Sequence, residues 1–375
     1  MKFKKLISSM LVCSLVLFSV VGCSESKESE VVKIAVAGPL TGDFAEYGTG
    51  FKNAVELAVN EWNNNGGVLG KKIEVVSFDD KNNGEEAATI SEKIVSDESI
   101  SGVIGHFSSG VCMAASPNYQ DSSVVNISPS ASHPDYTKEG EYIFRNNTVI
   151  DTEAGVAVDL ATKTLGKKKI GILSVKTDWG TSTAEITKKL IEKAGGEVVD
   201  HQEVVEGTVD YSPNITKLNN AGAEVVIAAC MYNTLGPFAS QYKDINPNIE
   251  LVGFSNAYSQ QLINLAKENA ENIHFPTIFF HGSEDESVQK FVKSYTDEYG
   301  TEPSSLTAQA YDSANILLKS IEAAGSTDKE AIQEQVSSIV YKGVTGETKF
   351  DENGDAIKVF KVVKIQDGEF VEVEQ

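Results

Sequence analysis

The turn 105–110, GHFSSG, places two hydroxyls and a glycine between an apolar run and a helix-like segment. The run 101–104 predicts a buried strand, and we expect Ser109 to cap a helix that starts near Val111. A helix N-terminus presents unpaired N–H groups and about half a positive charge, which favours a carboxylate or a phosphate. The glycine that ends the turn lets the backbone approach such a group. The alternative is that Ser108 and Ser109 only cap their own helix.

A second turn, SPSASHPDY, carries Ser128, Ser130 and Ser132 in a segment that is broken by two prolines. Serine hydroxyls and turn carbonyls have spare acceptor capacity, which suits an ammonium group. Together, the two turns would hold the zwitterionic end of an α-amino acid. A plain Ser/Pro-rich loop that binds nothing is the alternative.

Tyr47 and Trp179 each precede a glycine in a turn that follows an expected strand. An aromatic ring at the tip of a turn is poorly solvated unless it covers something. Two such rings on opposing halves of the protein predict a sandwich around a ligand. For either ring alone, packing beneath a loop is the alternative.

Other turns after expected strands are also rich in hydroxyls, glycines and single aromatic residues, with few charges. They include PLTGDFAEYG after Gly38, KTDWG after Val175, MYNTLG after Cys230 and FSNAYS after Gly253. Since ligands bind beyond the carboxyl ends of parallel strands, Tyr232 and Ser255 become further candidates for the site. These turns predict a polar clamp with aromatic walls around a small molecule.

Two motifs that approach nucleotide or enzyme sites are incomplete. The glycines at 48 and 50 follow their strand only after nine further residues, and position 53 is asparagine, unlike a dinucleotide fingerprint. The segment 253–257, GFSNA, approaches the nucleophile elbow of hydrolases, which also need a later acid and then a histidine. His274 is expected to open a strand instead. We therefore expect that this protein is not an enzyme. The remote alternative is a secreted serine hydrolase that acts through Ser255.

Strand-like and helix-like segments alternate from Val31 to about residue 280. Such alternation predicts parallel sheets with helices on both faces. Because one series ends at FRNN and a second follows it, we expect an α/β fold of two doubly wound, Rossmann-like lobes. Helices are expected over 284–299 and 305–324, followed by a β-rich end with Asn-Gly and Asp-Gly hairpin turns.

The first 22 residues have the layout of an export signal, with three lysines, a short apolar run and a small-residue cleavage site. The motif Val20-Val21-Gly22-Cys23 resembles a bacterial lipobox, in which the cysteine becomes the lipidated first residue. Residues 24–30, SESKESE, then form a polar tether from the membrane. An uncleaved anchor helix is the alternative; in both cases the folded part lies outside the cytoplasm.

The remaining charged and reactive residues exclude several functions. Removal of three lysines with the signal changes the net charge from −22 to −25, which opposes binding to nucleic acid. Cys112 and Cys230 are expected in different lobes without a disulfide, and neither has the spacing of a metal site. The sequence therefore predicts no metal and no cofactor. Arg145, the single arginine, is expected to make a structural contact at a hinge.

The chain resembles the extracytoplasmic solute-binding proteins of branched-chain amino-acid transporters. The resemblance rests on KIAVAGPLTGDFAEYGTGFKNAVELAVNEWNNNGGVLGKKIEVVSFDD, VIGHFSSG, ISPSASHP, KTDWG, AYDSANILLKSIEAAGS and GVTGETKFDENGD. It implies two lobes joined by three crossover strands that close like a hinge. The implied boundaries are 31–147 with 279–355 for lobe 1, and 148–278 with 356–375 for lobe 2.

The resemblance also implies roles for single residues. Ser109 matches the carboxylate-binding serine, and Ser130 and Ser132 match the turn that supplies a carbonyl and a hydroxyl. The positions that line the side-chain pocket are matched by Tyr47, Trp179 and Leu306. The family's acidic residue for the ligand ammonium is replaced by Ser255. Either Asp178 or, less favourably, Asp312 supplies that charge, or the ligand is not a plain α-amino acid.

The function implied is that of a monomeric, membrane-tethered receptor that delivers a small amino acid to an ATP-driven permease. The solute would bridge both lobes only in the closed state and so favour that state. Two alternatives of the same fold are a sensory receptor and a binder of amides or urea-like solutes.

Overall fold

A computed structural model describes residues 31–373 of the chain. The predicted signal peptide 1–22 and the lipidated cysteine with its tether, 23–30, lie outside the described residues. Within the described part, none of the helices is both long enough and apolar enough to span a lipid bilayer.

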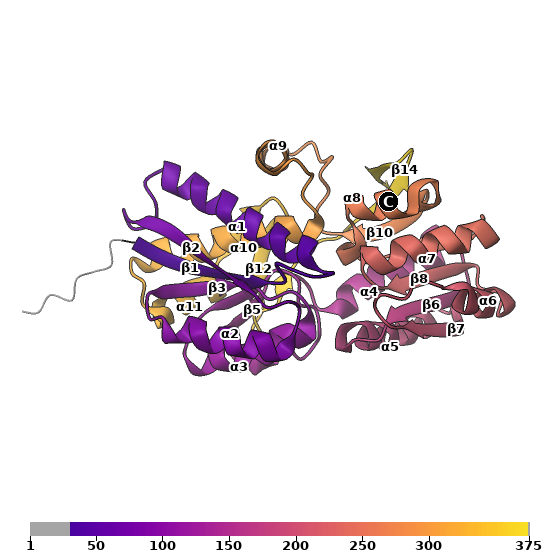
Figure 1. Ribbon diagram of the computed structural model, residues 1–375, viewed down its shortest axis with the longest axis horizontal. Helices are drawn as coiled ribbons and strands as arrows, with labels where there is room; N and C mark the ends of the chain where they lie inside the picture. Colours follow the sequence, from indigo (N-terminus) through magenta and orange to yellow (C-terminus); the bar gives the residue numbers. More distant parts are fainter. Residues whose placement is uncertain (1–30, 374–375) are drawn as a thin grey trace, which may run out of the picture.

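The first lobe is built on a parallel five-stranded sheet with the order β2-β1-β3-β4-β5 (Figure 1). Its strands are β1 (Val31–Gly38), β2 (Lys72–Asp79), β3 (Ile100–Ile104), β4 (Asn126–Ser128) and β5 (Ile143–Arg145). Its helices are α1 (Ala45–Asn64), α2 (Gly84–Ser96), α3 (Ser109–Asp121), α10 (Ser305–Ala324) and α11 (Lys329–Ser338), with α9 (Glu286–Tyr299) against α1. Helices α1 and α10 pack together, and α2 packs against α3 on the other face of the sheet.

The second lobe is built on a seven-stranded sheet with the order β15-β14-β10-β9-β8-β6-β7. Its strands are β6 (Lys169–Val175), β7 (Glu197–Val204), β8 (Val225–Ala229), β9 (Glu250–Val252), β10 (Ile273–Thr277), β14 (Lys361–Gln366) and β15 (Glu369–Glu372). Its helices are α4 (Ile150–Asp159), α5 (Asp178–Lys193), α6 (Ser212–Asn220), α7 (Tyr232–Ile245) and α8 (Gln260–Ala266). Only β14 and β15 are antiparallel to their neighbours, which confirms an α/β fold of two doubly wound lobes.

Three connections, over 146–149, 278–285 and 358–360, join the lobes. They are irregular segments rather than strands. A small antiparallel sheet lies beside the third connection and consists of β11 (Val340–Gly343), β12 (Gly346–Phe350) and β13 (Ala356–Ile357). The hairpin β14–β15 turns at Asp367-Gly368, where both residues have positive φ, as a two-residue type I′ turn requires.

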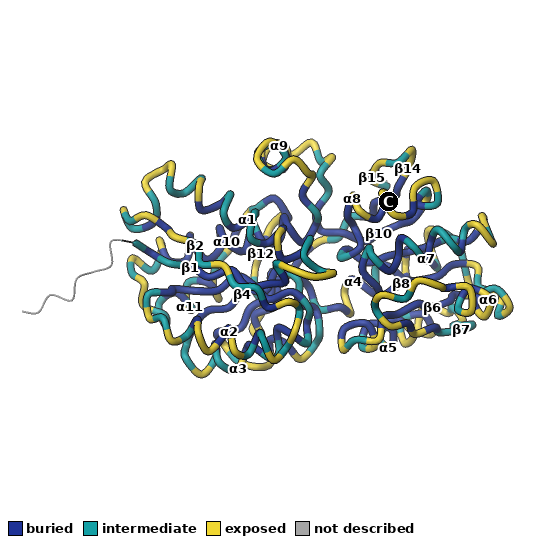
Figure 2. The backbone as a smooth tube through the Cα atoms, in the orientation of Figure 1, coloured by how far each residue is buried: buried dark blue, intermediate teal, exposed yellow. Residues whose placement is uncertain are grey.

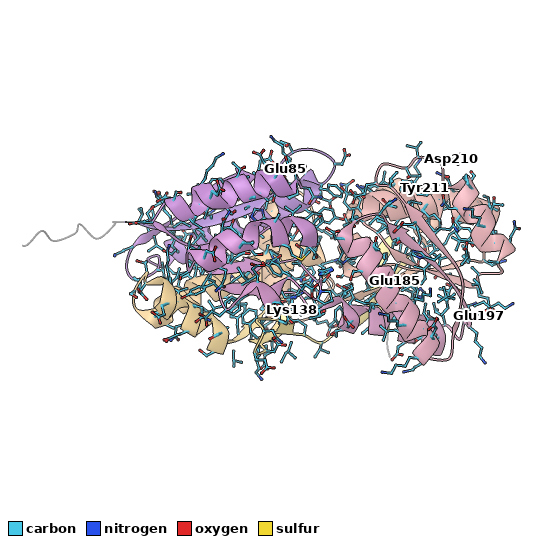
Figure 3. All side chains as sticks on the ribbon, turned by 90° about the horizontal axis from the view of Figure 1, so that it is seen from below. Glu85, Lys138, Glu185, Glu197, Asp210 and Tyr211 are labelled. Carbon is cyan, nitrogen blue, oxygen red and sulfur yellow. The ribbon has the colours of Figure 1, made fainter. Side chains whose placement is uncertain are left out.

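The interior of each sheet is apolar because helices cover both faces, so the central strands are buried along their whole length. All residues of β3, β8 and β10 are buried (Figure 2). Charged side chains such as Glu85, Lys138 and Glu197 project from the outside of the lobes (Figure 3). Cys112 and Cys230 are buried and free, as the sequence predicted.

Arg145, at the end of β5, is fully buried beside the first connection. Its Nε lies 2.5 Å from Oδ1 of Asp355, which precedes β13. Its other nitrogens donate to the carbonyl of His133 and to the hydroxyl of Thr137, both at 2.9 Å. The arginine therefore ties the strand that leads into the first connection to the segment that leads into the third, which confirms its predicted structural role.

Candidate functional site

A cavity of about 410 Å³ lies between the lobes, at the carboxyl ends of the strands of both sheets. The lining includes most of the predicted candidates, namely Ser108, Ser109, Ser130, Ser132, Asp178, Trp179, Ser255 and Leu306. Among the described residues, the lining contains three carboxylates and no lysine, arginine or histidine. The cavity therefore has a negative electrostatic character apart from its helix N-termini.

Ser109 is the first residue of helix α3 rather than its cap, so the helix begins two residues earlier than predicted. Ser108 occupies the capping position with an extended backbone, but its side chain makes no capping hydrogen bond. The hydroxyl oxygen of Ser109 accepts the N–H groups of Ser132 at 3.2 Å and of His133 at 3.3 Å. Because both contacts use the oxygen as an acceptor, the O–H of Ser109 is left to donate to a ligand.

The second serine turn is fixed by hydrogen bonds to its neighbours. The hydroxyl of Ser130 donates to the carbonyl of Phe107 at 2.6 Å, and its carbonyl accepts from the side chain of Asn147 at 2.9 Å. The hydroxyl of Ser132 accepts the indole N–H of Trp179 at 2.9 Å. Ser130 therefore acts mainly in shaping the turn, while Ser132 joins the first lobe to the second.

The aromatic wall differs from the predicted one. Trp179, at the start of α5, lines the cavity as expected, but Tyr47 and Tyr232 do not. Tyr47 stacks on Phe107 with ring centroids 4.2 Å apart, so Phe107 takes the wall position and Tyr47 lies behind it. Tyr232 packs against Tyr47 at 5.5 Å in this outer layer.

Hydrogen bonds between the lobes hold the cavity in a closed form. Besides the contact of Trp179 with Ser132, the hydroxyl of Tyr47 donates to the carbonyl of Asn256 at 2.8 Å. Near the second connection, the hydroxyl of Ser259 donates to Glu46 at 2.6 Å. Tyr47 therefore contributes to closure from outside the lining.

The carboxylate that sequence reasoning missed is Glu153 on helix α4. It is only 3% exposed, and its Oε1 accepts the backbone N–H of Ser255 at 2.5 Å. Burial raises the pKa of Glu153 to about 7, against the smaller opposing effect of the hydrogen bonds from Ser255. A signal was available in the sequence, since Glu153 lies within the apolar stripe of the helix, which is formed by Ile150, Ala154, Ala157 and Val158.

Of the two acids proposed from the sequence, one lies outside the cavity and the other lies at its exposed edge. Asp312 is not in the lining, because its carboxylate accepts the N–H groups of Val344 at 3.0 Å and Thr345 at 2.8 Å and so fixes the β11–β12 turn. Asp178 does line the cavity, but it is exposed at its edge. Glu206, a third lining acid, is partly exposed, and its pKa is raised by burial and by nearby Asp43.

The hydrolase alternative finds no support in this geometry. Ser255 begins a short helical turn and faces Glu153, while neither His274 nor His281 lines the cavity. His281 is hydrogen-bonded to the hydroxyl of Tyr258 instead. The described lining therefore contains no serine–histidine pair.

Comparisons with known proteins agree with this architecture. Residues 31–369 match the periplasmic binding protein family. The chain is 28% identical over 350 residues to the Leu/Ile/Val-binding protein homolog 1 of Brucella abortus, an alignment that covers 92% of this chain and 94% of the relative. It is also 28% identical over 336 residues to the leucine-, isoleucine-, valine-, threonine- and alanine-binding protein of Pseudomonas aeruginosa, covering 88% and 89%.

A solved structure extends the comparison to the fold. The substrate-binding protein LivJ of the branched-chain amino acid transporter of Streptococcus pneumoniae, in complex with isoleucine, superposes with a TM-score of 0.85. It shares 27% identity, and the match covers 92% of this chain and 100% of that one. Because the family match includes both lobes and the cavity between them, this chain belongs to the periplasmic binding protein family, whose members bind solutes and are not enzymes.

Proposed function

We propose that this protein is the substrate-binding component of an ABC importer that captures a small neutral amino acid, of the branched-chain class, between its lobes. The relatives that bind leucine, isoleucine and valine support this ligand class. The observation that carries the proposal is the start of helix α3, where the Ser109 hydroxyl and unpaired backbone N–H groups face the cavity.

The ligand's carboxylate would lie at the start of α3, where the helix dipole and the donors favour an anion. Its side chain would contact the apolar wall of Phe107, Trp179 and Leu306. The cavity volume of about 410 Å³ is at the low end of the 300–1,000 Å³ that is usual for small-molecule sites, which suits a single amino acid. Since the ligand contacts both lobes only when they are closed, it stabilises the closed form that the permease would recognise.

Ser109→Ala is expected to weaken leucine binding by about 1–3 kcal/mol, because the carboxylate loses a buried donor. Isothermal titration calorimetry with leucine, isoleucine and valine measures this change. The matched control is 3-methylbutylamine, which is leucine without its carboxylate, because its weaker binding should hardly respond to the substitution. Equal losses for leucine and the amine would show that Ser109 only shapes the turn, and unchanged leucine affinity would contradict the proposed role.

We further propose that the protein is a monomer anchored through a lipid on Cys23 and that it works with a permease in the membrane. The lipobox-like residues 20–23 support the anchor. Replacement of Cys23 by serine is expected to move the protein from the membrane fraction to the soluble fraction of the producing cells. Retention of the variant in the membrane fraction would contradict the anchor.

A further inference from the structure

Glu153 is a buried carboxylate without a cationic partner. Its side chain is 3% exposed and lines the cavity, and its Oε1 accepts the N–H of Ser255 at 2.5 Å. Among the described residues, no lysine, arginine or histidine forms an ion pair with it, and none lines the cavity. Burial of an unpaired carboxylate costs several kcal/mol, so such groups are normally paired. Glu153 is therefore either protonated, as its raised pKa of about 7 allows, or paired with a cation that the ligand brings.

Glu153 and the start of α3 belong to different lobes but line the same cavity. Ser109 leads the helix of the first lobe, and Glu153 projects from α4, the first helix of the second lobe after the 146–149 connection. The start of α3 offers hydrogen-bond donors and a partial positive charge, and Glu153 offers a carboxylate that is negative when ionised. This polarity matches a molecule that carries an anionic and a cationic group close together.

The other two acids of the lining are poorly placed for this role. Asp178 is exposed, and its Oδ2 lies only 2.6 Å from the position that a Cβ on Gly110 would occupy, beside the start of α3. It therefore lies near the expected carboxylate of the ligand rather than near the ammonium. Glu206 is partly exposed in the loop after β7, where burial and the charge of Asp43 raise its pKa. Solvent screens both groups more than it screens Glu153.

We infer that Glu153 is the counter-charge for the ligand's ammonium group and that it restricts the substrate to solutes with a cationic nitrogen next to a carboxylate. The inference rests on the proposed amino-acid function and makes it more specific. Glu153 supplies, from helix α4, the charge that is missing at Ser255, and it is held in place by the backbone of that same residue. Amides and urea-like solutes lack the cation and would leave the buried carboxylate unpaired.

The test compares Glu153→Gln with the original protein for leucine and for 4-methylpentanoate, which is leucine without its amino group. Glutamine keeps the shape of the side chain and an oxygen that accepts the N–H of Ser255, so the fold should be retained. We expect leucine affinity to fall at least about 30-fold, as when one partner of a buried charge pair is removed. Binding of 4-methylpentanoate should be unchanged or tighter. Asp178→Asn and Glu206→Gln are the matched controls and should change leucine affinity less than about threefold.

Each outcome is decisive. A leucine affinity within about threefold of the original in Glu153→Gln would overturn the inference while leaving the proposed function intact. Equal losses for both ligands would overturn it too, since they would show a structural role. If the variant does not fold, the original protein still decides, because equal affinity for leucine and 4-methylpentanoate would exclude an ammonium site. If the original protein binds no amino acid at all, the proposed function fails as well.

Discussion

Leucine affinity is expected to fall about 25-fold when the pH is lowered from about 7.5 to about 5.5, as titration calorimetry in matched buffers would show. The reason is that the ligand's ammonium binds the ionised form of Glu153, whose pKa burial raises to about 7. With that pKa, roughly three quarters of the molecules carry the charge at the higher pH, and only about 3% carry it at the lower pH. Both charged groups of leucine stay ionised over this range, so the change reports on the protein.

Other titratable groups near Glu153 define the controls. Asp178 on α5 and Glu206 after β7 share the cavity, and His274 lies on β10, which packs against α4. Glu153→Gln should bind leucine weakly with little dependence on pH, because its side chain cannot titrate. Glu206→Gln should keep the full dependence. A pH profile that stays equally steep in Glu153→Gln would assign the titration to another group and refute this prediction.

Asp355→Ala should lower the free energy of unfolding by about 3–5 kcal/mol, measured by urea denaturation without ligand. The substitution leaves the fully buried charge of Arg145 with only the neutral acceptors of His133 and Thr137. It also removes the acceptor of the Thr137 hydroxyl, which donates to Asp355 at 2.8 Å. Burial lowers the pKa of Arg145, but an arginine remains charged at neutral pH, so the uncompensated charge persists.

A matched surface pair tests whether burial of the pair or pairing alone causes the predicted loss of stability. Asp135 and Lys138 are 2.6 Å apart, but both side chains are largely exposed, so Asp135→Ala should leave the unfolding free energy nearly unchanged. In a second variant, Arg145→Met combined with Asp355→Ala should recover part of the lost stability, because no buried charge remains. If Asp355→Ala and Asp135→Ala lowered the unfolding free energy by similar amounts, burial would not be the cause.

The architecture could be read from the sequence because it depends on local periodicity. Alternating apolar runs and amphipathic segments predicted the parallel sheets, and 284–299 and 305–324 became α9 and α10 with boundaries shifted by at most two residues. Asp367-Gly368 predicted a hairpin turn because few other residues accept positive φ. These features are set by neighbours along the chain, so no knowledge of distant contacts was needed.

The details of the cavity wall depended on packing between distant segments. Tyr47 stands before a glycine as predicted, yet its ring stacks behind Phe107, because the turn 105–110 is closer to the cavity. Ser109 faces the cavity as proposed, but its hydroxyl oxygen accepts N–H groups from the neighbouring turn instead of capping its helix. A side chain of the right type was recognised in both cases, while its partner was not.

The sequence alone therefore determined the two lobes, the edge of the sheets that borders the cavity, and the serine turns that face it. Only the tertiary structure decided which acid lies inside that edge. Asp312 proved to be held by the backbone of the β11–β12 turn, and Glu153 proved to be buried against Ser255, 102 residues further along the chain. The physical reason is that the environment of a carboxylate is set by the segments that pack around it, and those segments come together only when each lobe folds.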